Sequence, residues 1–426
     1  MSSVGDRFPL GVNYWPRRKA MYWWSDFDRG EVAEEFDVIA ALGLSVARIF
    51  LLWDDWQPSP DVVSADRLRD LGTVLDVASD RGLGLDVTFF TGHMSGPNWS
   101  PRWLLDRSAD RHPSPHVRQV VSGGVVVDGS YRNMFHDPVA LEAERLLLET
   151  VVGEYRDHPG VWLWNLGNEP DLFAHPHNTD AGRRWVREMT GRIKDLDPVH
   201  PVTTGLHTAS LFTDNGLRVD EVFAESDVAV MHGYPMYVEW ARDPLDPDFV
   251  PYLCALVTAL SGEPCLAEEW GGCTSPDTEG SVTWAWDAYG QPRNQFMAGE
   301  EVFASYVRQV LPRLVEVGAT GAFLWCFADY APQLWNRPPC DEGGARHERH
   351  FGLVRPDGSL KPHTESLRAF AATGPTIQDP VKTVDLDVSP EEYYLDPAGH
   401  ARRLYQTFSS RPDRRGSESA SQPTGQ

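Results

Sequence analysis

The sequence predicts one (β/α)8 barrel over residues 1–372, with long loops after its third, sixth and seventh strands. Short apolar runs alternate with helical patterns eight times in this range, and several runs are apolar almost throughout. Strands that helices cover on both faces have this continuous apolar character, and eight strand–helix units in a row are typical of a closed parallel barrel. No G-x-G-x-x-G or P-loop motif follows any run, which argues against an open nucleotide-binding sheet.

Predicted strands and helices alternate along the whole of this range. The strands are expected at residues 9–15, 46–53, 84–90, 161–169, 201–207, 227–234, 264–271 and 321–330. Apolar residues at helical spacing place the helices at 31–42, 66–81, 139–156, 181–196, a short segment within 208–223, 248–260, 300–317 and 363–371. Gly82 is expected to end the second helix, and Pro138 to begin the third.

Three long connections leave the predicted carboxyl ends of strands, at residues 91–137, 235–247 and 272–299. Barrels build their active sites on this face, and long loops in a compact domain tend to be functional. After the barrel, residues 373–408 form an acidic extension that is expected to pack on or near it, with one strand-like patch at 381–388. Residues 409–426 are rich in Arg, Ser, Pro, Gly and Gln, which predicts a disordered tail.

The composition excludes some partners and favours others. A formal net charge of −24 repels phosphate backbones and anionic lipid, so we expect neither nucleic-acid nor membrane binding. The 16 tryptophans exceed what packing requires and favour an aromatic-lined cleft for a small saccharide, since flat rings stack on the apolar faces of sugars. No pattern indicates an oligomeric state.

Metals, disulfides and cofactors are not expected. The five cysteines are odd in number and form no C-x-x-C pair, and His158, His175 and His177 do not fall at convincing metal-ligand spacing. The first residues lack the basic and apolar segments of a signal peptide, and no run is long enough to cross a membrane. These features predict a cytoplasmic location.

Two glutamates end predicted strands and carry the functional hypothesis. Glu169 closes the fourth strand in NLGNEP, and Glu269 closes the seventh in AEEWG. A single glutamate at a strand end is usually a cap or a solvated group, but these two strands lie across the barrel mouth from each other. Glycosidic cleavage needs one carboxyl to protonate the leaving oxygen and a second on the opposite face of the sugar ring. Glu268 competes with Glu269, because neighbouring strand residues point to opposite sides and only one can face the site.

The N-E-P and E-aromatic-G motifs resemble clan A glycoside hydrolases, and family 5 in particular, over about residues 9–372. The positions that match the family are Arg48, His93, Asn168, Glu169, His232, Tyr234, Glu269 and Trp325. The resemblance implies that Glu169 is the general acid/base, with a raised pKa, and that Glu269 is the nucleophile.

The resemblance also assigns supporting roles. Arg48 would keep Glu269 ionised and Tyr234 would orient it, while Asn168 would contact the sugar 2-hydroxyl and Trp325 would floor the subsite. Three of the matched positions have plain structural alternatives: Arg48 as an interior ion-pair partner, and His232 and Trp325 as core residues. Trp53, which follows the second strand, is a further candidate for shaping the sugar subsite or for the core.

The substrate class rests on the resemblance, and the missing signal-peptide pattern and the long loops after the third and seventh strands agree with it. The GVNYWP, LLWDDWQP and GHMSG segments look closest to the β-mannosidase-like branches of family 5. We therefore expect a retaining exo-β-mannosidase that acts on the non-reducing end of short oligosaccharides. The alternatives are an endo-β-1,4-mannanase or other β-glycanase and, in a different class, an inactive sugar-binding barrel.

Overall fold

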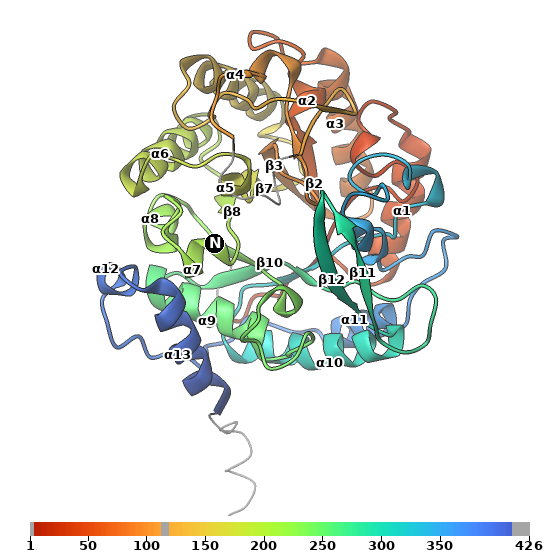
Figure 1. Cartoon of the computed structure of the whole chain (residues 1–426), viewed down its shortest axis with the longest axis vertical. Coiled ribbons are helices and arrows are strands. Elements are labelled where there is room, and N and C mark those ends of the chain that lie inside the picture. The colour runs from red at the N-terminus through yellow and green to blue at the C-terminus, as the bar shows by residue number, and fades with distance from the viewer. Residues whose placement is uncertain (1–3, 112–118, 411–426) are drawn as a thin grey trace, which may run out of the picture.

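A computed structural model describes residues 4–111 and 119–410 and confirms the predicted barrel. Eight parallel strands form the central sheet in the spatial order β8-β7-β3-β2-β1-β13-β10-β9, and the helices surround it (Figure 1). The strands are β1 (Leu10–Asn13), β2 (Val46–Leu52), β3 (Gly84–Thr91), β7 (Val161–Asn168), β8 (Val202–Gly205), β9 (Ala229–Gly233), β10 (Cys265–Gly271) and β13 (Ala322–Trp325).

The two ends of this strand order meet, which closes the barrel. The amide of His232 donates to the carbonyl of Leu206 at 2.8 Å, and the amide of Asp227 donates to the carbonyl of Val202 at 2.8 Å. The carboxyl ends of all eight strands therefore surround one mouth.

The helices lie close to their predicted positions. The longer ones are α1 (Arg29–Ala41), α3 (Ala65–Ser79), α4 (Pro138–Tyr155), α6 (Thr179–Leu196), α9 (Phe249–Ser261), α10 (Glu300–Glu316) and α11 (His363–Ala372). Asp28 and Asp137 cap the first turns of α1 and α4 with their carboxylates, which satisfies free backbone amides. After β8 the structure has two short helices, α7 (Ala209–Phe212) and α8 (Val219–Phe223), where the sequence predicted one; Gly216, at φ +85°, lies between them.

Two of the long loops contain strands that the sequence did not predict. The loop after β3 holds β4 (Asn98–Trp99), β5 (Val120–Ser122) and β6 (Val125–Val127), and the loop after β10 forms a hairpin of β11 (Val282–Ala288) and β12 (Gln291–Met297). The turn of this hairpin is Tyr289–Gly290, with both residues at positive φ, as a two-residue hairpin turn of the favoured kind requires. In Figure 1 the hairpin stands beside the barrel mouth.

The C-terminal extension is helical where it is regular. It carries α12 (Pro390–Tyr393) and α13 (Pro397–Ser410), and the hydroxyls of Tyr393 and Tyr394 donate to backbone carbonyls of α7. The strand-like patch at 381–388 is irregular, because a closed barrel offers no free edge for a strand to join. Residues 409 and 410, predicted as the start of the tail, continue α13, and residues 411–426 lie outside the described residues.

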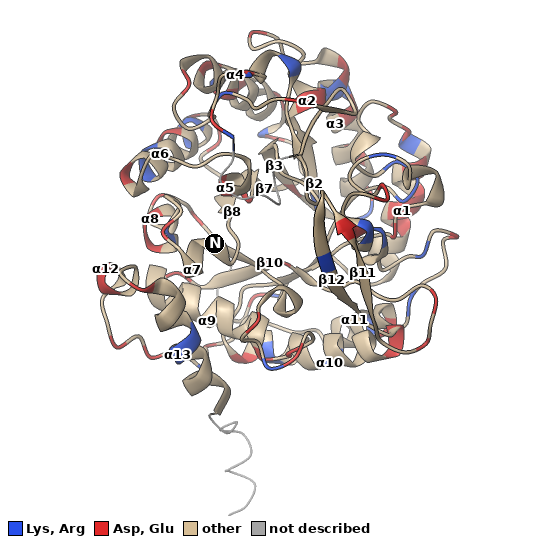
Figure 2. Ribbon diagram, in the orientation of Figure 1, with Lys and Arg blue, Asp and Glu red and all other residues tan. Residues whose placement is uncertain are grey.

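Charged residues of both signs are scattered over the outer helices (Figure 2). Among the residues that the structure describes, no helix combines the length and the apolar character needed to cross a lipid bilayer.

Candidate active site

A cavity of about 300 Å³ opens at the carboxyl ends of the barrel strands. It is lined by seven of the eight positions that match family 5, namely His93, Asn168, Glu169, His232, Tyr234, Glu269 and Trp325. The eighth, Arg48, is fully buried beneath them and contacts Glu269 from below. The structure thus brings together residues from β2, β3, β7, β9, β10 and β13.

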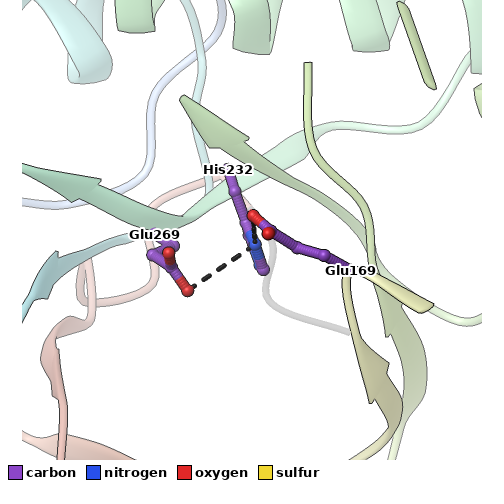
Figure 3. Close-up of side chains that lie close together, drawn as sticks. All are labelled: Glu169, His232 and Glu269. Carbon is purple, nitrogen blue, oxygen red and sulfur yellow. Dashed lines mark hydrogen bonds and ion pairs between the residues drawn. The ribbon is translucent and has the colours of Figure 1, made fainter. Parts of the chain in front are cut away.

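Glu169 and Glu269 face each other in this cavity, with His232 between them (Figure 3). One carboxylate oxygen of each glutamate and one ring nitrogen of His232 all lie within 4.8 Å of one another. Glu169 follows β7 in the left-handed conformation, at φ +48° and ψ +55°. Such a backbone costs a non-glycine residue on the order of 1–3 kcal/mol and is concentrated at functional sites.

A bulge in β10 decides how Glu268 and Glu269 are placed. Leu266 pairs with Val230 and Glu269 with His232, so three steps along β10 match two along β9. The extra residue breaks the alternation of side chains, and both glutamates reach Arg48 in the barrel interior. The expectation that they point to opposite sides is therefore wrong. Glu269 lines the cavity, whereas Glu268 is fully buried below it.

Glu269 is held by two donors. The Tyr234 hydroxyl donates to its Oε1 at 2.6 Å, and Arg48 donates to its Oε2 at 3.1 Å. These contacts fix the carboxylate toward the cavity from β9 and β2, in the positions that the family resemblance implies for an oriented, ionised group.

Glu268 holds together the buried polar residues below the cavity. Its carboxylate accepts from Asn165 Nδ2 at 3.0 Å and from His232 Nε2 at 2.9 Å, and it lies 3.5 Å from Arg48. His232 in turn places Nδ1 3.0 Å from Glu169 Oε1. The buried carboxylate therefore orients the imidazole that touches Glu169.

The protonation pattern differs from the sequence expectation of a raised pKa at Glu169. Burial raises the pKa of Glu169, but the nearby His207, His232 and His93 outweigh burial and hold it below its usual range. Burial, supported by the charge of Glu169, raises the pKa of Glu269. The protons of this cluster are instead held by His207 and His232, whose pKa values are raised.

Two of these histidines have strongly raised pKa values. Burial lowers the pKa of His232, but Glu269, Glu169 and Glu268 outweigh it and raise the value to about 9. Burial also opposes the charge on His207, but Asp171 and Glu169 raise its pKa to about 9. His207 Nε2 lies 2.9 Å from Asp171 Oδ2. Near neutral pH both imidazoles are therefore charged, and His232 contacts Glu169 directly through Nδ1.

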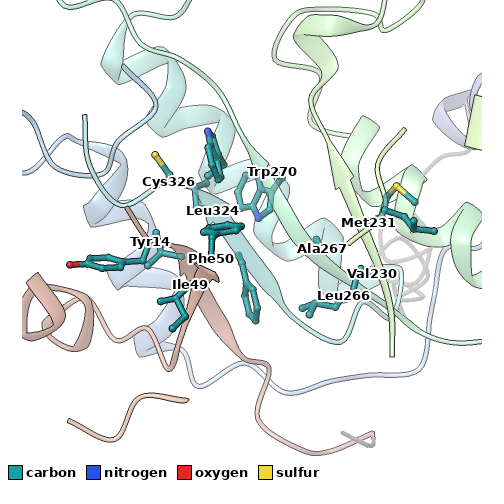
Figure 4. Packing of buried hydrophobic residues seen from close by; sticks show 14 of the residues in the cluster. Tyr14, Ile49, Phe50, Val230, Met231, Leu266, Ala267, Trp270, Leu324 and Cys326 are labelled. Carbon is teal, nitrogen blue, oxygen red and sulfur yellow. The ribbon is translucent and has the colours of Figure 1, made fainter. Parts of the chain in front are cut away.

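Asn168 and Trp325 complete the matched set. Asn168 accepts from Arg48 at 3.0 Å and donates to the carbonyl of His93 at 3.2 Å, which fixes its amide at the cavity wall. Trp325 ends β13, and its ring meets that of Phe50 edge-on at 6.0 Å. Phe50 belongs to the buried cluster shown in Figure 4, so the flat surface offered to a sugar rests on packed core.

Trp53 lies in the core, the alternative that the sequence left open. It is fully buried and donates to Gln57 at 2.6 Å, with Phe90, Trp103 and Phe173 around its ring. The aromatic residues after β2 therefore support the mouth from outside the cavity.

Several cavity residues were not proposed as site residues from the sequence, and most of them lie in the long connections between barrel strands and helices. They are His207, Tyr237, Tyr289, Arg293, His347 and Glu348. His207 ends a predicted strand, so the rule that selected Glu169 would also have selected it. The segment that contains His347 and Glu348 carries no motif, and its position depends on how the loops fold together.

Glu169, His232 and Glu269 are also the one group, within the described residues, whose side chains could offer three ligands to a metal ion. The raised pKa of His232 opposes that use, because a protonated imidazole has no lone pair to donate. The donor set suits proton transfer better than metal binding.

No protein-family model matches the chain. Mannan endo-1,4-β-mannosidase 2 of Oryza sativa subsp. japonica is 26% identical over 217 residues, which cover 47% of this chain and 44% of the rice protein. Mannan endo-1,4-β-mannosidase A of Hypocrea jecorina is 24% identical over 280 residues, which cover 60% of this chain and 59% of the fungal protein. The chain thus spans about half the length of these curated relatives.

Two solved structures extend the comparison. The exo-β-1,4-mannosidase Op5Man5 from Opitutaceae bacterium strain TAV5 is 26% identical with a TM-score of 0.67, covering 86% of this chain and 59% of that one. A GH5_18 protein from Streptomyces cattleya, solved with GlcNAc, is 21% identical with a TM-score of 0.75, covering 95% and 91%, and shares the fold. Together with the curated relatives, these neighbours confirm the resemblance to glycoside hydrolase family 5.

Proposed function

We propose that this chain is a retaining glycoside hydrolase that removes β-linked mannosyl groups from the non-reducing end of short oligosaccharides. The observation that carries the proposal is the facing pair Glu169 and Glu269, with one carboxylate oxygen of each within 4.8 Å of the other, in a cavity that Trp325 lines. Retaining glycosidases hold their carboxyls about 5–5.5 Å apart, while inverting enzymes leave about 6.5–9.5 Å for a water molecule. The short separation supports retention.

In the first step Glu269 attacks the anomeric carbon from the α face, and the bond to the leaving oxygen breaks. Glu169 protonates that oxygen. This proton comes from His232, which transfers its Nδ1 proton to Glu169 along the 3.0 Å hydrogen bond. The Nε2 proton of His232 stays on the ring and remains hydrogen-bonded to Glu268. Transfer leaves the imidazole neutral and Glu169 protonated, which reconciles its lowered pKa with an acid role.

In the second step water attacks the anomeric carbon of the glycosyl-enzyme, and the ester bond to Glu269 breaks. Glu169, now ionised, takes the proton from the water. Arg48 and Tyr234 stabilise the departing carboxylate through the bonds that they already make to Glu269. The product keeps the β configuration.

The preference for mannosides and for chain ends draws on two sources. The curated relatives are named as mannan endo-1,4-β-mannosidases, and a structural neighbour is named as an exo-β-1,4-mannosidase. Residues from the loops after β3, β10 and β13 line the cavity, which supports a pocket over an open groove. Endo-β-1,4-mannanase activity is the second candidate, because the curated relatives carry that name.

A panel of aryl β-glycosides and β-1,4-manno-oligosaccharides tests the proposal. We expect turnover of the aryl β-mannoside, mannose and the chain shortened by one residue as the early products from oligosaccharides, and β-mannose as the first anomer seen by NMR. Internal fragments would support the endo-mannanase, and α-mannose would contradict retention. Absence of turnover across the panel would favour the inactive sugar-binding barrel.

A further inference from the structure

The carboxylate of Glu348 reaches the cavity from the loop after β13. It belongs to the one-turn helix Arg346–His350 and is 9% exposed. Its Oε2 accepts from Ser95 Oγ at 3.2 Å and from the indole nitrogen of Trp325 at 3.4 Å. Glu348 therefore sits at the edge of the ring on which a sugar would stack.

The second oxygen, Oε1, lies 3.4 Å from His347 Nε2. That nitrogen cannot donate, because Arg293 donates to it at 3.1 Å and the Tyr237 hydroxyl lies 2.9 Å away. Burial and Arg293 also lower the pKa of His347 well below its usual range, so the ring is neutral. Oε1 is thus an acceptor beside the cavity for which the described residues offer no hydrogen-bond donor.

We propose that Glu348 selects the non-reducing end of the substrate by accepting a hydrogen bond from a free hydroxyl of the mannosyl group on Trp325. The inference rests on the proposed function and names the residue that sets its specificity. A free hydroxyl has a hydrogen to donate, whereas the oxygen of a glycosidic link has none. A chain extended at that position would leave the buried carboxylate without its donor, which costs binding energy.

Three loop segments, which contain Gly96, Tyr289 and Ala345, meet beside Glu348 at the cavity. Gly96, next to Ser95, has φ +112°, and a Cβ built on it would lie 2.6 Å from the Tyr289 hydroxyl and 3.3 Å from the Ala345 side chain. The amide of Tyr289 donates to the carbonyl of Gly343 at 2.7 Å, which ties the hairpin to the loop after β13. These loop segments and the Glu348 carboxylate therefore line the same part of the cavity.

The test compares Glu348→Gln with the parent protein on aryl β-mannosides that lack the 3-, 4- or 6-hydroxyl. In the parent, loss of the recognised hydroxyl should lower kcat/KM roughly 10- to 150-fold, the range for a hydrogen bond to a charged group. Glu348→Gln should lower kcat/KM on the intact mannoside by a similar factor and show little further loss on that deoxy substrate. Glu301→Gln, an exposed glutamate on α10, is the matched control.

A second arm uses mannotriose with a free or a 4-O-methylated non-reducing end. The parent should cleave the free form and fail on the capped form. Equal cleavage of both forms, or a uniform loss on every deoxy substrate in Glu348→Gln, overturns the role of Glu348 while leaving the proposed function intact. Failure of the parent on all β-mannosides overturns the proposed function itself. If Glu348→Gln does not fold, Glu348→Asp is compared with the parent on the same intact and deoxy substrates.

Discussion

Glu268 and Glu269 are neighbours in the chain, yet both carboxylates reach the guanidinium of Arg48, at 3.5 Å and 3.1 Å. The bulge in β10 makes this possible. One buried cation therefore serves two carboxylates with different surroundings: Glu269 faces the cavity, and Glu268 is enclosed with Asn165 and His232. The two positions should respond differently to substitution.

Glu269→Ala should abolish turnover of an aryl β-mannoside, by on the order of 10³-fold or more, without unfolding the protein. Azide should then restore turnover and give the α-azide, because it occupies the space of the missing carboxylate. Glu268→Ala should instead destabilise the fold by about 3–5 kcal/mol, since Arg48 and His232 lose a buried partner. Initial rates and urea unfolding separate the two effects. A folded Glu269→Ala variant with normal rates would contradict the assignment.

The activity should decline at alkaline pH. His207 and His232 have pKa values of about 9, so the store of protons for Glu169 empties as pH rises through that value. We expect kcat/KM on an aryl β-mannoside to fall above about pH 9, with an apparent pKa that belongs to the cluster. Glu268→Gln should move this limb to lower pH, because a carboxylate that stabilises the His232 cation is lost. An unchanged limb in that variant would argue against the histidine as proton source.

Glu348→Gln should stabilise the protein at alkaline pH. Burial raises the pKa of Glu348 from 4.5 to about 7. A carboxyl with a higher pKa in the folded state contributes stability below pH 4.5 that is lost as pH rises through about 7. The variant should therefore gain about 3 kcal/mol over the parent between pH 4.5 and pH 8.5, as measured by urea unfolding. Glu301→Gln, at an exposed position of α10, is the control variant in the same measurement.

Tyr234→Phe should lower kcat/KM roughly 10- to 100-fold, because it removes the 2.6 Å bond to Glu269. Tyr306→Phe is the matched control, since its hydroxyl is buried and has no hydrogen-bond partner among the described residues. Kinetics on one aryl β-mannoside compare the two variants. Equal small effects would remove Tyr234 from the proposed mechanism.

Much of the barrel and its strand-end residues could be predicted from the sequence, because buried parallel strands leave a strong apolar signal. Glu169 ends such a run, while Arg48 and Trp325 lie within theirs, and the topology gathers all three at one mouth. The hairpin also had a signal, since Val282, Trp284 and Trp286 stand at every second position before the turn glycine Gly290.

The remaining features depend on strand register and on contacts between distant residues, which cannot be predicted from a short segment of sequence. The bulge in β10 appears only when the strand is aligned with β9 and β13 on either side. Glu348 acquires its position from contacts with Ser95 and Trp325, which are distant in the chain. The proton store likewise arises from His207, His232 and Glu169 meeting across three strand ends, and no single segment contains that information.

The left-handed backbone of Glu169 has an evolutionary consequence. Glycine or asparagine would relieve its strain, so selection for stability alone opposes a glutamate there. A lineage released from catalysis would be expected to replace this residue early, before the surrounding core drifts. Persistence of glutamate at this position in homologous sequences would therefore be a mark of continuing selection for chemistry, and its loss would identify descendants that have turned to other uses.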